Sequence, residues 1–168
     1  ILAAHPEIDP ARVGITGHSY GGYMAALALV RHPDVFAAGV AGAPVTDWRN
    51  YDTIYTERYM RTPKENREGY DAGSAVRLAE NLEGDLLLLH GMRDDNVHPS
   101  NTFQMAAKLQ DLDIPFEMIM FPTATHGIGS AAYRSGKWSF LQTHLDGAAT
   151  ANDARRRLAM HARRLKRG

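Results

Sequence analysis

Six residues near the start of the chain have the types and spacing of a serine nucleophile. They read Gly17-His18-Ser19-Tyr20-Gly21-Gly22 and match G-x-S-x-G, a pattern that places a serine on a sharp turn between a strand and a helix. The flanking glycines have no Cβ atom, so neighbouring backbone can come close. The Tyr20 amide would face the oxyanion that forms when Ser19 attacks a carbonyl. The alternatives are an incidental serine in a glycine-rich turn and a phosphate-binding loop, which is disfavoured because no G-K-[ST] ending follows.

A serine nucleophile needs a general base and an acid that orients the base, and two later loops offer them. In α/β-hydrolases the chain order is Ser, then Asp or Glu, then His, each on a loop after a strand. Asp94 and Asp95 follow one predicted strand, and His126 follows the next. His126 would take the Ser19 proton, and the acid would hold the His126 tautomer. The chain has eight histidines, so His126 is distinguished from the others only by its place on the loop after a predicted strand. The spacing does not decide whether Asp94 or Asp95 is the acid.

The elements that must position these residues alternate between strand and helix. Short apolar runs predict strands, and longer runs rich in Ala, Leu and Met predict helices. Residues 44–70 are rich in aromatics and show no clear period. We expect strands at 12–16, 36–42, 85–90 and 115–121, a turn at 17–22, helices at 23–31, 99–112 and 133–145, and a shorter helix at 74–82. This alternation predicts an α/β fold with a mostly parallel sheet flanked by helices, and the elbow indicates an α/β-hydrolase.

Composition excludes several classes of protein. The 168 residues suffice for one domain, and no apolar run reaches the roughly 20 residues that a membrane span needs. The absence of cysteine rules out disulfides and thiolate metal sites, and it leaves the cellular compartment open. No H-E-x-x-H pattern is present. We therefore expect neither a metal nor a cofactor.

Charge is distributed unevenly along the chain. Residues 148–168 carry seven arginine and lysine residues against one aspartate, whereas the net charge of the whole chain is zero. An acidic body with a basic tail argues against a nucleic-acid-binding protein. We expect a catalytic domain over residues 1–146 and a basic tail over 147–168. The first residues lack the features of a signal peptide and read as the end of a helix, which predicts a longer parent protein.

Four stretches resemble one family of serine peptidases. The elbow, extended through Tyr23, resembles that of the prolyl oligopeptidase family. Residues 43–48, 55–60 and 90–98 (APVTDW, YTERYM and HGMRDDNVH) narrow the resemblance to the dipeptidyl peptidase IV-like branch. These motifs are long and occur in the family's order, and the resemblance covers about residues 7–146.

The resemblance implies a role for each candidate residue. Ser19 is the nucleophile, His126 the base, and Asp94, the first of the two aspartates, the acid. The Tyr20 amide donates to the oxyanion, and Asn96 helps to hold a substrate carbonyl. The hydrophobic pocket for proline would consist of Tyr20, Val45, Trp48, Tyr51, Tyr55 and Val97. Without the resemblance, ordinary core packing would be the simpler interpretation of these aromatic residues.

The triad pattern predicts a serine hydrolase, and the resemblance implies the C-terminal half of an α/β-hydrolase domain in a peptidase that releases X-Pro or X-Ala dipeptides from peptides through an acyl-enzyme at Ser19. The alternatives are an esterase or acyl-peptide hydrolase with the same triad, and a fragment without turnover. In the family, a β-propeller and further strands precede this stretch, and a tyrosine after those strands is the second oxyanion donor. We therefore expect residues 1–168 alone to be a poor catalyst. The family also implies a homodimer through the hydrolase domain, whereas Arg93 and the basic tail depart from its pattern.

Overall fold

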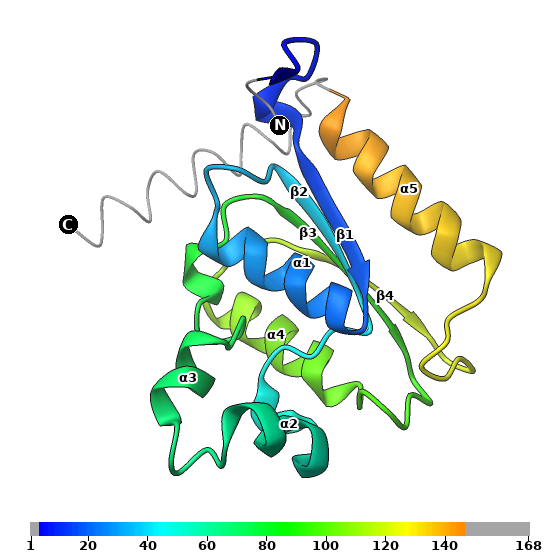
Figure 1. Ribbon diagram of the computed structural model, residues 1–168. Coiled ribbons are helices and arrows are strands. Elements are labelled where there is room, and N and C mark those ends of the chain that lie inside the picture. Colours follow the sequence, from blue (N-terminus) through cyan, green and yellow to red (C-terminus); the bar gives the residue numbers. More distant parts are fainter. Residues whose placement is uncertain (1–3, 147–168) are drawn as a thin grey trace.

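A four-stranded parallel sheet forms the centre of the fold in the computed structural model, which describes residues 4–146 (Figure 1). The strands are neighbours in chain order: β1 (Gly14–His18), β2 (Ala38–Gly42), β3 (Asp85–Gly91) and β4 (Glu117–Phe121). Their register aligns Gly17 with Ala41, and Ala41 with Leu88. Because all four strands run the same way, the loops that follow them meet at one edge of the sheet. No helix in the described part of the chain is long and apolar enough to cross a membrane.

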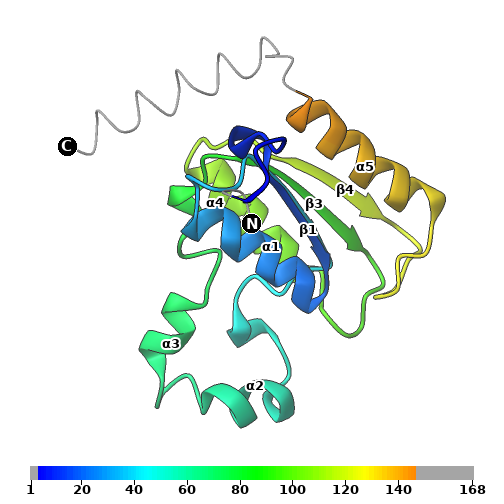
Figure 2. The same ribbon diagram turned by 45° about the horizontal axis from the view of Figure 1, so that its top comes forward.

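Helices cover both faces of this sheet. Figures 1 and 2 show α1 (Tyr20–Arg31) and α4 (Ser100–Asp111) on one side and α5 (Ala131–Leu145) on the other. Each side has its own cluster of buried apolar residues. The predicted α/β architecture, a parallel sheet flanked by helices, is therefore confirmed.

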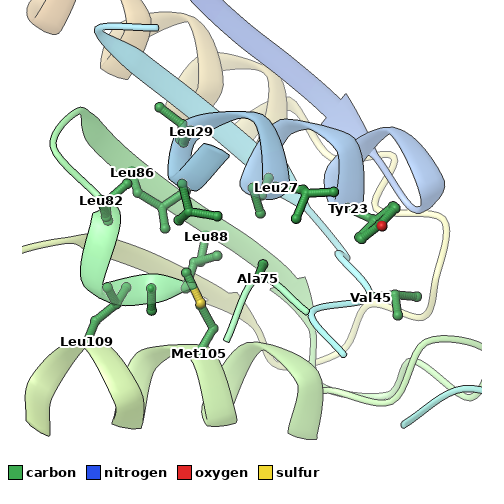
Figure 3. Packing of buried hydrophobic residues seen from close by; sticks show 14 of the residues in the cluster. Tyr23, Leu27, Leu29, Val45, Ala75, Leu82, Leu86, Leu88, Met105 and Leu109 are labelled. Atoms are coloured by element: carbon green, nitrogen blue, oxygen red, sulfur yellow. The ribbon is translucent and has the colours of Figure 1, made fainter. Parts of the chain in front are cut away.

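Strand β3 is buried on both of its faces. Leu86 and Leu88 pack in the cluster with α1 and α4, where Figure 3 shows them among Leu29, Met105 and Leu109. Leu87 and Leu89 point the other way and pack with Phe140 and Leu141 of α5. Each of these strand leucines is at most 1% exposed, so each contributes about 1.5–3 kcal/mol of burial free energy. Burial on both faces explains the continuous apolar sequence that made this strand easy to predict.

The turn around the serine is shorter than the sequence predicts. The sequence predicts a turn over residues 17–22 and a helix from residue 23, but β1 continues through His18 and α1 begins at Tyr20, so Ser19 alone separates the two elements. Gly17 and Gly22 belong to these regular elements, which pack too closely there to accept a side chain, whereas a Cβ atom at Gly21 would meet nothing within 4 Å. Glycine content is therefore misleading here as a turn signal.

Residues 44–70 contain regular structure that the sequence pattern does not predict. They include the 3-10 helix η3 (Trp48–Asn50), the helix α2 (Thr53–Met60) and the first four residues of the helix α3 (Arg67–Ala72). The missed signals are the helix caps: the Asp52 carboxylate accepts the Tyr55 N–H, and the Asn66 side chain accepts the Gly69 N–H. An apolar period is missing because Thr56 is the one buried residue of α2.

The helix predicted over residues 74–82 is wrong, because these residues form turns followed by the 3-10 helix η4 (Ala79–Asn81). A 3-10 helix also precedes β1, η2 (Pro10–Arg12). The basic tail predicted over residues 147–168 lies outside the described residues.

Candidate active site

Ser19 occupies a strained position at the carboxyl end of β1. Its backbone has φ 58° and ψ −119°, a region that side-chain-bearing residues rarely adopt, and its N–H donates to Gly42 O at 2.8 Å. A Cβ atom at Gly17 would lie 2.2 Å from Gly21 O, and one at Gly22 would lie 2.3 Å from Gly42 O. The two glycines therefore let α1 cross close to the strands. This packing holds the Ser19 side chain out from the sheet edge, where a substrate can reach it.

His126 links this serine to Asp94. Its Nε2 lies 2.9 Å from Ser19 Oγ, and its Nδ1 lies 2.8 Å from Asp94 Oδ2. A carboxylate only accepts hydrogen bonds, so the proton of the neutral imidazole sits on Nδ1 and leaves Nε2 free to accept the serine proton. This is the geometry of a nucleophile with its general base and an orienting acid.

Asp94 is held firmly for this role. Its side chain is 0% exposed, and its Oδ1 accepts the N–H groups of Asn96 at 3.0 Å and Val97 at 2.9 Å. The other oxygen, Oδ2, is thus aimed at His126. The structure brings Asp94, and not Asp95, to the histidine, and Asp95 is exposed to solvent.

A second histidine, His90, lies buried behind the acid and was not identified from the sequence. Its Nε2 lies 2.8 Å from Val97 O and 3.2 Å from Asp94 Oδ2, while its Nδ1 lies 2.7 Å from Thr102 Oγ1. Burial is the main cause that lowers the pKa of His90. A neutral ring with its proton on Nε2 satisfies every contact, because it donates to the carbonyl and the carboxylate and accepts the threonine hydroxyl. The neutral His90 ring therefore donates a further hydrogen bond to the Asp94 carboxylate without placing a positive charge beside it.

The N-terminus of α1 lies directly at Ser19, which is the N-cap of this helix. Tyr20 is the first residue of this helix, and the first N–H groups of a helix have no partner within it. The helix dipole adds positive potential at this end. The Tyr20 N–H is therefore suited to stabilise negative charge on an oxygen bound to Ser19.

Aromatic side chains form an open cavity of about 480 Å³ beside the elbow. Trp48 lines this cavity and contacts three neighbouring rings, with ring centroids 5.9 Å from Tyr20, 5.8 Å from Tyr51 and 5.9 Å from Tyr55. The cavity is lined by Tyr20, Tyr23, Trp48, Tyr55, Thr56, Tyr59 and Met60. Tyr20 and Tyr55 are 54% and 41% exposed, which is unusual for aromatic residues in a packed core.

The predicted proline pocket maps onto this region only in part. Tyr20, Trp48 and Tyr55 line the cavity, whereas Tyr51 packs edge-on against Trp48 and Tyr55 outside the lining. The two predicted valines, Val45 and Val97, are buried in the core cluster that includes Trp48. Asn96 accepts a hydrogen bond of 2.7 Å from Tyr51 Oη. Tyr23, Thr56, Tyr59 and Met60 line the cavity without having been predicted, since their pattern resembles ordinary packing.

The described residues include no group of three or more histidine, aspartate or glutamate side chains placed to hold a metal ion. The chemistry that these side chains can perform is nucleophilic attack by Ser19 on a carbonyl carbon, with His126 as proton acceptor.

Comparison with curated proteins points to dipeptidyl peptidases. Dipeptidyl peptidase 8 from Mus musculus is 45% identical over 131 residues, which cover 76% of this chain and 15% of that protein. A probable dipeptidyl-aminopeptidase B from Colletotrichum graminicola is 47% identical over 130 residues, which cover 75% of this chain and 14% of that protein. The chain thus spans about 15% of the length of the curated relatives that it matches.

Solved structures agree with the sequence comparison. The crystal structure of Porphyromonas gingivalis dipeptidyl peptidase 4 superposes with a TM-score of 0.80 and 45% identity, over 83% of this chain and 20% of that one. A putative dipeptidyl aminopeptidase IV from Bacteroides ovatus superposes with a TM-score of 0.83 and 33% identity, over 86% and 21% of the two chains. The family model described as the prolyl oligopeptidase family matches residues 1–148. The resemblance seen in the motifs is confirmed: the chain belongs to the prolyl oligopeptidase family.

Proposed function

We propose that this chain carries the catalytic centre of a serine peptidase that releases dipeptides with proline or alanine at the penultimate position. The observation that carries the proposal is the hydrogen-bond chain from Asp94 through His126 to Ser19. Its serine also has the strained backbone of a nucleophile elbow, which an incidental hydrogen-bond network would not require. The names of the relatives, dipeptidyl peptidase 8 and dipeptidyl-aminopeptidase B, support the dipeptide-releasing part.

The reaction proceeds in two halves that use the same groups. Ser19 Oγ attacks the substrate carbonyl carbon while its proton moves to His126 Nε2, and the Tyr20 N–H stabilises the oxyanion. The tetrahedral intermediate collapses as His126 gives that proton to the departing amine, which leaves an acyl ester on Ser19. Water then loses a proton to His126 and attacks the ester, and Ser19 regains its proton as the dipeptide leaves. Asp94 stabilises the imidazolium in both halves.

The aromatic residues near Ser19 suit a proline ring. A pyrrolidine ring is compact and apolar, and the near-parallel rings of Trp48 and Tyr55, 27° apart, offer it a flat wall. The Tyr51 hydroxyl donates to Asn96 Oδ1, which leaves the Asn96 NH₂ group available to a substrate carbonyl. These contacts support a pocket that binds the residue before the scissile bond.

Two parts of the proposal rest on the sequence alone. They are the division into a catalytic domain, residues 1–146, with a basic tail, 147–168, and the pairing of two hydrolase domains into a homodimer.

The function is tested by comparing two chromogenic substrates on the protein that carries this chain. Gly-Pro-nitroanilide presents a dipeptide with penultimate proline, and nitrophenyl butyrate presents a short acyl ester. We expect kcat/KM for the dipeptide substrate to exceed that for substrates in which proline is replaced by leucine. Ester hydrolysis without cleavage of the dipeptide substrate would favour the esterase alternative.

Removing the Tyr55 ring should impair proline substrates selectively. Tyr55→Ala deletes one wall of the cavity, so we expect kcat/KM for Gly-Pro-nitroanilide to fall about 10- to 100-fold, in line with the burial free energy of an aromatic side chain. Hydrolysis of nitrophenyl butyrate should change by less than about threefold, because a small ester does not need the wall. Tyr55→Phe is the matched control and should retain activity on both substrates. Equal losses on the two substrates would assign Tyr55 a general structural role.

A further inference from the structure

His18, the residue before the nucleophile, joins three separate elements of the site. Its Nε2 lies 2.8 Å from the main-chain carbonyl oxygen of His126, and its Nδ1 lies 3.0 Å from Tyr133 Oη on α5. Its ring centroid is 5.1 Å from that of His126 and 5.8 Å from that of Tyr133. The end of β1, the loop that carries the base, and the start of α5 are therefore connected through one half-buried side chain.

The partners of His18 determine its protonation. A carbonyl oxygen only accepts, so the His18 proton must be on Nε2, and Nδ1 of the neutral ring then accepts the Tyr133 hydroxyl proton. Burial is the main cause that lowers the pKa of His18; the hydrogen bond to the His126 carbonyl and the charge of Asp94 act in the opposite direction, and the charge of His126 acts with burial. The neutral ring fits this site because a positive charge there would oppose the imidazolium that forms on His126 during attack.

The backbone of β2 leaves room for this bridge. A Cβ atom at Gly42 would lie 2.1 Å from Tyr133 Oη and 3.0 Å from His18 Nδ1. Glycine is therefore needed where the two side chains meet. The same Gly42 also accepts the Ser19 N–H, so the bridge and the elbow rest on one segment of backbone.

The loop that carries His126 is anchored two residues away from the base on each side: Ala124 O accepts the Arg93 N–H at 2.9 Å, and Ile128 is buried. Between and after these anchors lie Gly127 and Gly129, where a Cβ atom would meet nothing within 4 Å. Glycines in open surroundings leave a backbone free to choose among many conformations. A hydrogen bond to the carbonyl of His126 itself restricts the loop where its position matters for the reaction.

We propose that His18 is a positioning residue for the general base: its Nε2–H, oriented by Tyr133, fixes the main chain of His126 so that the imidazole bridges Asp94 and Ser19. This inference rests on the proposed function in one respect, namely that Ser19 and His126 are the reacting pair. His18 itself touches no reacting atom, so its effect is on the fraction of time that the base is in place.

The test compares His18→Leu with His18→Gln. Leucine cannot donate to the His126 carbonyl, whereas the glutamine amide can place an N–H near the position of Nε2. We expect His18→Leu to lower the rate of Ser19 labelling by a fluorophosphonate about 10- to 100-fold, the order of loss that misplacement of a reacting group produces. His18→Gln should recover to within about threefold of the unaltered protein.

A spectroscopic measurement separates positioning from packing. The proton shared by His126 Nδ1 and Asp94 gives a downfield NMR resonance, which we expect to weaken in His18→Leu and to return in His18→Gln. Tyr133→Phe keeps the ring and removes only the hydroxyl, so it should lower the rate of labelling by a smaller factor, about three- to tenfold. This variant tests the same hydrogen-bond bridge if His18→Leu does not fold. His32→Leu, a change at the exposed far end of α1, is the matched control and should label normally.

Each outcome decides the proposal. Equal labelling of His18→Leu and the unaltered protein, or equal losses in the leucine and glutamine variants, would overturn it. If the unaltered protein labels no better than Ser19→Ala, the proposed function fails, and the NMR resonance then decides the role of His18. A resonance that persists in His18→Leu would show that the bridge does not position the base.

Discussion

Ser19→Ala is expected to lower kcat for Gly-Pro-nitroanilide roughly a million-fold, the loss typical when the nucleophile of a triad is removed. The change deletes only the Oγ that lies 2.9 Å from His126 Nε2. Circular dichroism should show an unchanged fold, because the backbone strain at position 19 is the same for alanine. Labelling by a fluorophosphonate should disappear as well.

The matched control is Ser135→Ala, which removes an exposed hydroxyl on α5 that donates to Ala132 O. This variant should keep full activity and full labelling. Continued labelling of Ser19→Ala would identify another nucleophile and contradict the assignment.

Asp94→Asn should lower kcat about 10,000-fold while leaving KM nearly unchanged. The two backbone N–H groups that bond Oδ1 keep the side chain in the same orientation, so the new NH₂ group takes the place of Oδ2. It then donates to His126 Nδ1 and forces the proton onto Nε2, where the imidazole can no longer accept from Ser19. The second N–H of the same NH₂ group faces the Nε2–H of His90, which still donates to Val97 O, so the asparagine N–H is a buried donor without an acceptor and costs about 1–3 kcal/mol of folding free energy.

The measurements are steady-state kinetics and the thermal midpoint of unfolding, which should fall. Asp95→Asn is the matched control, because Asp95 is the neighbouring, exposed aspartate, and it should change neither quantity by much. Comparable losses in both variants would show that the choice between the two aspartates is wrong.

The hydrogen-bonded candidate triad could be predicted from the sequence because each of its members follows a strand. A parallel sheet gathers the ends of its strands at one edge, so chain order and loop position were enough to select Ser19 and His126. Spacing alone left the acid open between Asp94 and Asp95. The two aspartates differ because of a turn, in which Asp94 accepts hydrogen bonds from the backbone N–H groups of Asn96 and Val97. The local sequence does not reveal which of two adjacent aspartates will accept such bonds.

Contacts between distant segments explain most of what the sequence did not show. His18 meets partners that lie 108 and 115 positions further along the chain, and no local pattern records such a pairing. Three cavity side chains of α2, those of Thr56, Tyr59 and Met60, were missed for a related reason, whereas Tyr55 was predicted from the family resemblance. Exposed tyrosines on a helix with one buried residue give no apolar period, although the Asp52 cap marks where the helix begins.

The bond from His18 reaches the backbone at position 126, not the imidazole. This hydrogen bond therefore does not depend on which side chain occupies position 126, and it fixes the path of the loop independently of the imidazole. A different base, or an unnatural amino acid with altered basicity, can be introduced at position 126 on an unchanged main-chain scaffold. The side chain at position 126 can therefore be redesigned while the hydrogen bond from His18 to the main chain of that position is kept.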